Sequence, residues 1–436
     1  MRINPVKPRV VRRVAVGVDV GVTDRPRVLL DASAEGARIL RCRAVLSFRV
    51  LFRVIFRVML FGFFCVVHSL WAAVLPEEKV EVLYHQYAES DQDINGPAVL
   101  VQKRIGKKYS LTYSHLVDRV TGASVDVRLY ASPYVETRKE NTLSATHLFP
   151  KGTFSVGLSQ SVENDFEARS AFWQLSQETF GGMTTVNLGF SRAWDEISRR
   201  NDDAFAQTAD RWQYRLGVSQ VLTPSWITSV ALETITDEGY LNNPYRQVRY
   251  LDASVDAGYS FSAEVYPETR TSYALSIFSK YYVDIPGAVG FQYRYFTDSW
   301  AISAHQFSFQ YNQPWRDVWE FEGRLRWYTQ NGAEFFSDLF PFGSVNTALR
   351  SQNFQARDKE LADLTSLTVG LGVSYTLKDW GGKWADDLQL NVFWDRLMVD
   401  YDNYREVDRQ LNVAPGLEPL YQLDANIFRL FITLRL

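Results

Sequence analysis

The chain has 436 residues, of which 46% are hydrophobic and 14% aromatic, and this length accommodates one large domain or two to three ordinary ones. The formal net charge is only −3, but residues 1–72 carry 13 of the 47 basic and 4 of the 50 acidic residues, which leaves the remainder at −12. Because so acidic a body repels phosphates, the composition excludes nucleic acid as a partner.

The first element is a candidate leader. An uncharged, largely apolar run at 59–70 follows three arginines and precedes two alanines, namely Arg49, Arg53, Arg57, Ala72 and Ala73. This order of charge, apolar run and small residues predicts a signal peptide over 49–72. An anchor helix is the alternative, because the uncharged run 58–76 approaches the roughly 20 residues that a membrane crossing needs. Residues 1–48 are either an unusually long leader or an over-extended start, so 1–72 is treated as leader and 73–436 as the folded domain.

Cysteine usage agrees with export. The two cysteines, Cys42 and Cys65, both precede residue 73. A mature chain without thiols suits an oxidising compartment, where a stray thiol could form a wrong disulfide.

Beyond residue 73 the dominant pattern is alternation. In 318–330 one face holds Trp319, Phe321, Leu325 and Trp327, and the other holds Glu320, Glu322, Arg324 and Arg326. Since successive strand side chains point to opposite faces, one side of this segment is apolar and the other charged. The pattern recurs in 108–118, 184–194 and 366–377. No apolar run in this region approaches 18 residues, so no membrane helix is expected there.

The alternating segments predict about 16 antiparallel strands, with a range of 14 to 18. We place them at 79–87, 97–105, 108–118, 134–148, 152–162, 165–178, 183–195, 209–222, 225–236, 270–283, 288–296, 300–312, 317–330, 364–378, 385–400 and 421–436. Connections after even-numbered strands are short, whereas most after odd-numbered strands are long, the extremes being 237–269 and 331–363. Short turns at one end and long loops at the other are typical of an outer-membrane barrel with both termini on the short-turn side.

A soluble β-sandwich also alternates, so a second signal is needed. A sandwich packs its apolar face inward, whereas a barrel exposes that face to lipid and lines a wet lumen with the polar one. Several tryptophans fall near expected strand ends, where an interfacial girdle would lie: Trp226, Trp300, Trp315, Trp380 and Trp384. The aromatic girdle and the loop lengths together favour a transmembrane antiparallel β-barrel, located in the outer membrane of a bacterial cell.

The last predicted strand has the alternating pattern of a barrel-assembly signal. In IFRLFITLRL the residues Phe428, Leu430, Ile432, Leu434 and Leu436 share one face. An alternating apolar terminal strand resembles the signal that barrel-assembly machinery reads, although most such signals end in an aromatic residue and this one ends in leucine.

Six stretches carry a further resemblance: GPAVLVQKRIGKKYSLTYSHLVD from Gly96, GASVDV from Gly122, ASPYVETR from Ala131, GYLNNPYRQVRYLD from Gly239, YRYFTDSWAISAHQFSFQY from Tyr293 and FFSDLFP from Phe335. Together they resemble an uncharacterised family of bacterial outer-membrane barrels catalogued as domain of unknown function 3570. The resemblance implies a barrel and an outer-membrane location, and it implies no catalytic residues. Members are thought to be encoded near thioredoxin-like and flavin-transfer proteins, which implies an envelope redox setting.

Charges on the predicted inner faces are the first candidate site. Glu320, Glu322, Arg324 and Arg326 share one strand face, and Arg294 lies on the inner face of another strand. A charged wall inside a barrel can select solutes by the sign of their charge. The plainer alternative is that these charges neutralise one another across the lumen.

A long loop is the second candidate. It combines turn formers with aromatic and basic residues, namely Tyr240, Asn242, Asn243, Tyr245, Arg246 and Arg249. Such a loop constricts the lumen, presents a binding surface, or is an ordinary ordered surface loop. The segment 121–133 alternates only in part and is a candidate inserted plug, an extra strand or a plain loop.

Catalysis is not expected. His115, His147 and His305 could join a serine and an acidic residue in a hydrolytic group, but His115 and His147 lie on apolar faces near strand ends. No nucleophile-elbow or zinc-protease motif occurs, and no cofactor or metal site is predicted. The leading hypothesis is a porin-like conduit for small solutes in contact with outer-membrane lipid and lipopolysaccharide. The alternative is a closed structural or docking barrel for an envelope complex with a periplasmic partner, which could be redox-linked.

Overall fold

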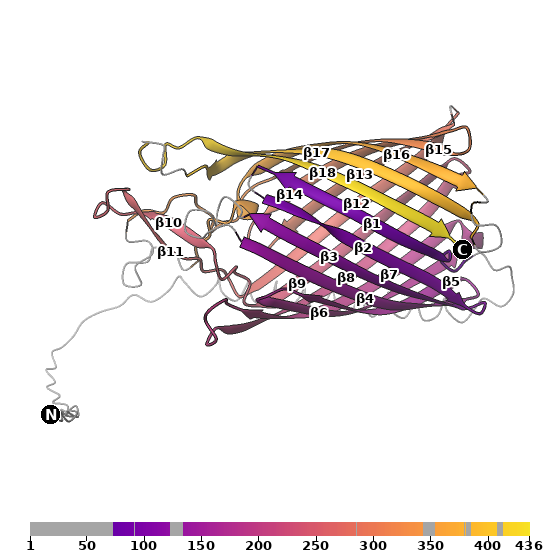
Figure 1. Ribbon diagram of the computed structural model, residues 1–436, viewed down its shortest axis with the longest axis horizontal. Helices are drawn as coiled ribbons and strands as arrows, with labels where there is room; N and C mark the ends of the chain where they lie inside the picture. The colour runs from indigo at the N-terminus through magenta and orange to yellow at the C-terminus, as the bar shows by residue number, and fades with distance from the viewer. Residues whose placement is uncertain are drawn as a thin grey trace, which may run out of the picture. The chain divides into compact units, whose positions relative to one another are not determined.

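The computed structural model describes residues 73–90, 92–122, 134–284, 286–342, 354–378, 380, 385–407 and 413–436, so the expected leader lies outside the described residues. Sixteen antiparallel strands close into one barrel (Figure 1). Its strands are β1 Lys79–Glu89, β2 Gln92–Ile105, β3 Tyr109–Gly122, β4 Tyr134–Phe149, β5 Gly152–Val162, β6 Phe166–Thr179, β7 Thr184–Ser198, β8 Ala206–Thr223, β9 Trp226–Gly239, β12 Thr269–Val283, β13 Gly287–Asp298, β14 Ser303–Trp315, β15 Trp319–Gln330, β16 Leu364–Lys378, β17 Asp387–Arg405 and β18 Leu420–Arg435.

The strand order is that of a simple meander. Neighbours in the chain pair with one another, β9 pairs with β12, and β1 closes the ring against β18, with Lys79 opposite Arg435. The predicted count of 16 and the predicted class are confirmed. A closed barrel leaves no strand edge unpaired, which is why strands can cross lipid in this form.

A separate hairpin, β10 Gln247–Leu251 with β11 Tyr259–Ala263, lies inside the long connection between β9 and β12. The sequence analysis did not predict it. Two short 3₁₀ turns, Phe180–Gly182 and Lys359–Leu361, complete the regular structure of the described residues. Within the described part of the chain no helix is long and apolar enough to cross a membrane.

The register explains the alternation. On β14, Phe309 pairs with Phe291 and Leu325, whereas the next residue, Gln310, pairs with Gly290 and Arg324. The apolar set is on the outside, since Phe309 is 50% and Leu371 59% exposed. Apolar side chains that face outward from a closed barrel exclude the sandwich alternative, in which they would fill the core.

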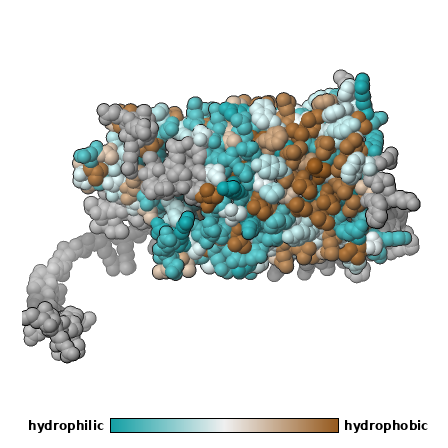
Figure 2. Space-filling view, in the orientation of Figure 1, coloured by the Kyte–Doolittle hydropathy of each residue, from teal (hydrophilic) through white to brown (hydrophobic). Residues whose placement is uncertain are grey.

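The apolar surface forms a belt that lies toward the short-turn end. Figure 2 shows brown, hydrophobic residues concentrated on that side and teal, hydrophilic residues over the middle and the long-loop side of the same face. Ion pairs such as Arg169 with Glu167 at 2.8 Å and Arg192 with Asp210 at 3.0 Å occupy the outside beyond the belt. The 19 residues of β17 exceed the about 9 to 11 that cross a bilayer, so the strands project past the lipid at the long-loop end.

The five predicted girdle tryptophans have different outcomes. Trp226 and Trp315 are exposed at the short-turn end, as expected for the girdle, and Trp380 is exposed in a connection at the same end. Trp300 is only 5% exposed and packs inside the long-loop end, so its assignment to the girdle was wrong. Trp384 lies outside the described residues.

Candidate functional site at the mouth of the barrel

Three connections at the long-loop end fold together into one cap, made of the described residues of 240–268, 331–363 and 406–419. Backbone bridges join its parts: Tyr250 lies beside Phe340, and Val265 exchanges hydrogen bonds of 3.0 and 2.8 Å with Gln355. The cap is therefore an ordered substructure rather than a set of separate surface loops.

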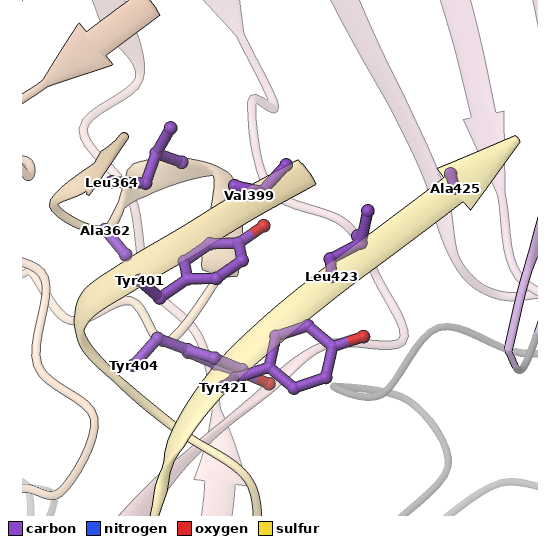
Figure 3. Close-up of a cluster of buried hydrophobic side chains, with 8 residues drawn as sticks. All are labelled: Ala362, Leu364, Val399, Tyr401, Tyr404, Tyr421, Leu423 and Ala425. Atoms are coloured by element: carbon purple, nitrogen blue, oxygen red, sulfur yellow. The ribbon is translucent and has the colours of Figure 1, made fainter. Parts of the chain in front are cut away.

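Apolar packing attaches the cap to the barrel wall. Trp300 meets Tyr266 and Phe335 edge to face, with ring centroids 5.5 and 5.2 Å apart. Figure 3 shows a second cluster, in which Tyr404 and Ala362 are fully buried. Its members are Ala362, Leu364, Val399, Tyr401, Tyr404, Tyr421, Leu423 and Ala425. Since these residues come from the cap and from β16 to β18, the cap covers that part of the lumen wall.

A buried ionic network holds the three cap segments together. Arg249, whose side chain is fully buried, donates to Asp338 at 2.6 Å and to Glu418. Arg357, 2% exposed, donates to the other oxygen of Asp338 at 2.9 Å and to the hydroxyl of Tyr404 at 3.1 Å. One carboxylate thus serves two buried guanidinium groups. Breaking such a pair is expensive because it leaves a charge in a poorly solvated place.

Between the cap and the opposite rim of the barrel lies a cavity of about 680 Å³. Its rim side includes Glu136, Glu163, Asp165 and Arg211, and its cap side includes Tyr245, Arg246, Asp358 and Glu360. A second cavity of about 240 Å³ lies on the lumen side and shares Arg270 and Glu360 with the first. The two cavities adjoin at these residues.

The predicted loop residues all lie in or beside the cap. Tyr240 packs edge to face on Phe205, Asn242 bonds to the backbone of Glu264 at 2.8 Å, and Asn243 accepts from the Tyr245 amide at 2.9 Å. The Tyr245 hydroxyl donates to Asp165 across the cavity and accepts from the Arg200 amide at 2.8 Å. Arg246 pairs with Asp358, and Arg249 belongs to the buried network. Asn242, Asn243, Tyr245 and Arg246 therefore line the larger cavity, whereas Arg249 stabilises the cap.

Asp358 is the most perturbed acid of the cap. Its carboxylate caps the 3₁₀ turn that follows, pairs with Arg246 and accepts from the Tyr266 hydroxyl at 3.4 Å. Burial raises the pKa of the Asp358 carboxyl to about 7, since desolvation outweighs the favourable charge of Arg246, and Glu360 and Glu264 add to the increase. Its charge consequently changes near neutral pH.

Three acids cluster on the rim side of the larger cavity. Glu136, Glu163 and Asp165 each offer an oxygen, and these oxygens lie within 4.8 Å of one another. Burial, followed by the charge of Glu136, raises the pKa of Glu163. Arg138 lies 3.9 Å from Glu163, and the Tyr245 hydroxyl already donates to Asp165. The cluster makes this side of the mouth acidic.

The predicted lumen residues lie on the inner wall but do not form one site. Arg294 reaches past Ser276 on β12 to pair with Glu233 on β9 at 2.7 Å. Glu320 and Glu322 both accept from Asn312, at 2.9 and 3.1 Å. Arg326 is exposed to the lumen and has no ion pair within the described residues.

Arg324 belongs to a group that the sequence analysis did not find. It lies 3.2 Å from Glu322 and donates to Asp395 on β17 at 3.0 Å, while Arg429 on β18 donates to the same carboxylate. Phe393 lies under both guanidinium groups, 4.8 and 5.7 Å from the ring centre. Arg324 and Arg294 are each paired with an acid two strands away along the wall, rather than with one another across the lumen.

The sequence analysis also missed Asp338, Arg357, Asp358, Glu418 and Arg270. Nothing local distinguishes these residues from solvated loop charges, because their partners lie as far as 169 positions away in the sequence. The segment 123–133, which holds most of the candidate plug, lies outside the described residues.

The three histidines do not come together. His115 bonds to Asn141 at 2.9 Å on β3, His147 stacks beside Tyr109 on β4, and His305 bonds to the Tyr293 hydroxyl at 2.9 Å on β14. All three share faces with outward apolar residues, so they lie on the exterior wall rather than in a common pocket.

A closed antiparallel barrel with an external apolar belt, polar lumen, short turns at one end and a folded cap at the other defines a class: the chain is a β-barrel protein of the bacterial outer membrane. The family follows from the sequence. The model of the family described as "Protein of unknown function (DUF3570)" matches residues 125–393, and the chain belongs to this family. The resemblance in the sequence analysis is confirmed.

Comparison with other proteins adds the fold alone. No curated protein sequence matches the chain. The chain is similar to OmpT, an outer membrane protein of Vibrio cholerae, at 11% identity and a TM-score of 0.38 over 84% of this chain and 100% of that one. It is also similar to a Pseudomonas aeruginosa FadL homologue, at 10% identity and a TM-score of 0.40 over 82% and 90%. A third similar structure is the CymD monoaromatic hydrocarbon channel, at 10% identity and 0.37 over 83% and 89%.

Proposed function

We propose that the protein is a conduit for small solutes across the outer membrane, with an entrance narrowed to one side by the cap. The observation that carries the proposal is the pair of adjoining cavities between the cap and the barrel wall, which share Arg270 and Glu360. A barrel of 16 strands is wide enough to leave an aqueous path through its centre. A solute entering from the long-loop side would pass the larger cavity first and then the smaller one.

The polar inner wall supports passage rather than tight packing. Exposed Arg326 has no ion pair among the described residues. A solvated wall with mixed charges is the usual lining of a barrel that passes polar solutes. No residue group with the geometry of a catalytic site was found on this wall within the described chain, and we propose that the protein is not an enzyme.

Planar-bilayer conductance and liposome swelling test the proposal. Purified protein should give discrete conductance steps and admit small uncharged solutes, with a size limit set by the capped mouth. The Asp338→Asn variant, which removes the charge shared by Arg249 and Arg357, provides a second measurement with a loosened cap. A folded, inserted barrel that passes neither ions nor solutes in either form would overturn the proposal.

The second candidate is a closed barrel that docks an envelope complex, with an envelope redox partner as one form of it. One observation favours it: two apolar clusters and a buried ionic network hold the cap in place. Such an ordered cap suits a docking surface. This candidate predicts an inserted barrel that does not conduct and that copurifies with a periplasmic protein.

We infer further partners from the outer surface. The apolar belt contacts membrane lipid, and the charged exterior beyond it, with Arg169 and Arg192, is placed for the lipopolysaccharide of the outer leaflet. The outward residues of β18, Phe428, Leu430 and Ile432, are exposed and supply the alternating pattern for barrel-assembly machinery.

A further inference from the structure

The smaller cavity, of about 240 Å³, is lined partly by hydrogen-bond donors. Arg270 and Arg294 line it together with Gln306, Tyr328 and Gln330. Apolar side chains of Phe296, Ile302 and Ala304 complete the wall, and Ile302 and Ala304 are 3% and 2% exposed. The cavity therefore combines a cationic side with a small apolar side.

The two arginines are fixed in position by acids one and two strands away. Arg270 donates through Nε and Nη2 to Asp298, at 2.7 and 2.6 Å, and lies over the ring of Trp300 at 4.5 Å. Nη1 of Arg270 makes no hydrogen bond to the described residues. Arg294 donates to Glu233 at 2.7 Å and to Ser276 at 3.4 Å. Each guanidinium is thus oriented by one acid and retains donor capacity toward the cavity.

A third arginine, Arg326, lies next to the cavity and offsets the charge of Glu360 in its lining. Arg326 lies on the same lumen face of β15, two residues before Tyr328, which lines the cavity. Arg270 and Arg294 have acidic partners, but Arg326 has none within the described residues. Glu360 lies at the junction with the larger cavity, where its side chain is 72% exposed and Arg246 is 3.8 Å away.

We propose that this cavity binds the carboxylate of a small organic monoanion as it passes from the mouth to the lumen, a proposal that rests on the conduit function above. Guanidinium groups in a fixed orientation bind carboxylates through paired charge-assisted hydrogen bonds. The partly enclosed position beneath the cap strengthens this attraction relative to bulk water. The apolar side, formed by Phe296, Ile302 and Ala304, fits a short hydrocarbon chain next to the carboxylate, as in propionate.

Propionate is the probe for the test. In liposome swelling, the protein should admit propionate faster than propionamide, an uncharged molecule of the same size. Arg326→Gln removes the unpaired charge without leaving an acid unpartnered, and it should reduce the propionate preference roughly tenfold. Tyr328→Phe is the second variant and should reduce the preference less. Arg192→Gln, on the exterior wall, is the control and should change nothing.

The outcomes separate this proposal from the conduit proposal. Entry of propionamide with no preference for propionate, or a preference that survives Arg326→Gln and Tyr328→Phe together, overturns the carboxylate subsite and leaves the conduit standing. Entry of neither solute in any form overturns the conduit, and the subsite with it. Loss of the preference in Arg326→Gln with unchanged propionamide entry supports both.

Discussion

Removing the charge of Asp338 should open the cap without unfolding the barrel. The carboxylate accepts from Arg249 at 2.6 Å and from Arg357 at 2.9 Å, and the two arginine side chains are 0% and 2% exposed. The Asp338→Asn variant keeps the shape of the side chain but leaves one buried guanidinium charge without its acid. Breaking a buried pair in this way costs about 3–5 kcal/mol.

Arg249 keeps Glu418 as a partner, so we take the lower end of that range, about 3 kcal/mol. Since about 1.4 kcal/mol changes an equilibrium constant tenfold, the fraction of protein with an open cap should increase on the order of 100-fold. Barrel stability should change little, because the strand ladder does not depend on the cap.

Cysteine labelling measures this opening directly. Ala362, a residue of the cap, is fully buried where the cap packs on β16 to β18, so a cysteine in its place reacts with a maleimide only when the cap opens. Cys42 and Cys65 are replaced by serine in the same background. We expect labelling about 100-fold faster in Asp338→Asn and unchanged in the control Asp252→Asn, whose acid bonds to Ser254 and Ser260. Equal labelling rates with and without the Asp338 charge would show that the network does not hold the cap.

Three further predictions follow from the same structure. Burial raises the pKa of Asp358 to about 7, so the capped form binds more protons than an opened form in which this carboxyl has its ordinary pKa of 3.8. Lowering the pH from 8 to 5 should therefore stabilise the cap by about 2–3 kcal/mol, and Asp358→Asn should abolish this pH dependence in the labelling assay. Phe309→Arg, on the lipid face, should lower the free energy of unfolding from lipid vesicles by about 2–4 kcal/mol, while Gln310→Arg, the next residue but lumen-facing, should change it by less than about 1 kcal/mol. Trp300→Ala should weaken the attachment of the cap by about 3–5 kcal/mol, measured as faster labelling at position 362 with unaltered barrel melting, whereas loss of the barrel itself would contradict the role of Trp300 in holding the cap.

The strands were predictable because their signal is local. Each crossing repeats an alternation with a period of two residues, and the segment 364–378 was predicted with the bounds that the structure has. The tilt of the strands and the closure of the barrel largely follow from this alternation. Where a strand extends beyond the lipid, as β17 does to Arg405, the apolar face ends and the prediction at 400 stopped with it.

The cap was not predictable in the same way. Trp300 follows the end of a strand, and its sequence context is that of a girdle residue, yet it is buried because Tyr266 and Phe335 from distant loops meet it. Asp338 and Glu418 are ordinary loop acids until the fold brings Arg249 between them. Burial decides the role of such residues, and burial here depends on contacts between loops far apart in the chain, which a periodic pattern cannot reveal.

The uneven loop lengths have a consequence for where selectivity would arise in the proposed conduit. The long connections after β9, β15 and β17 form the cap, and the larger cavity lies between the cap and rim residues of β4 to β9. A solute then enters off the barrel axis and must pass the cap edge at Glu360 and Arg270, where the two cavities adjoin. The charges deeper in the lumen, such as Asp395 with Arg324, already neutralise each other. Selection of solutes by the sign of their charge should therefore depend on the cap edge and on Arg326, which has no ion pair among the described residues. The cap would then both narrow the entrance and support the residues that select the solute.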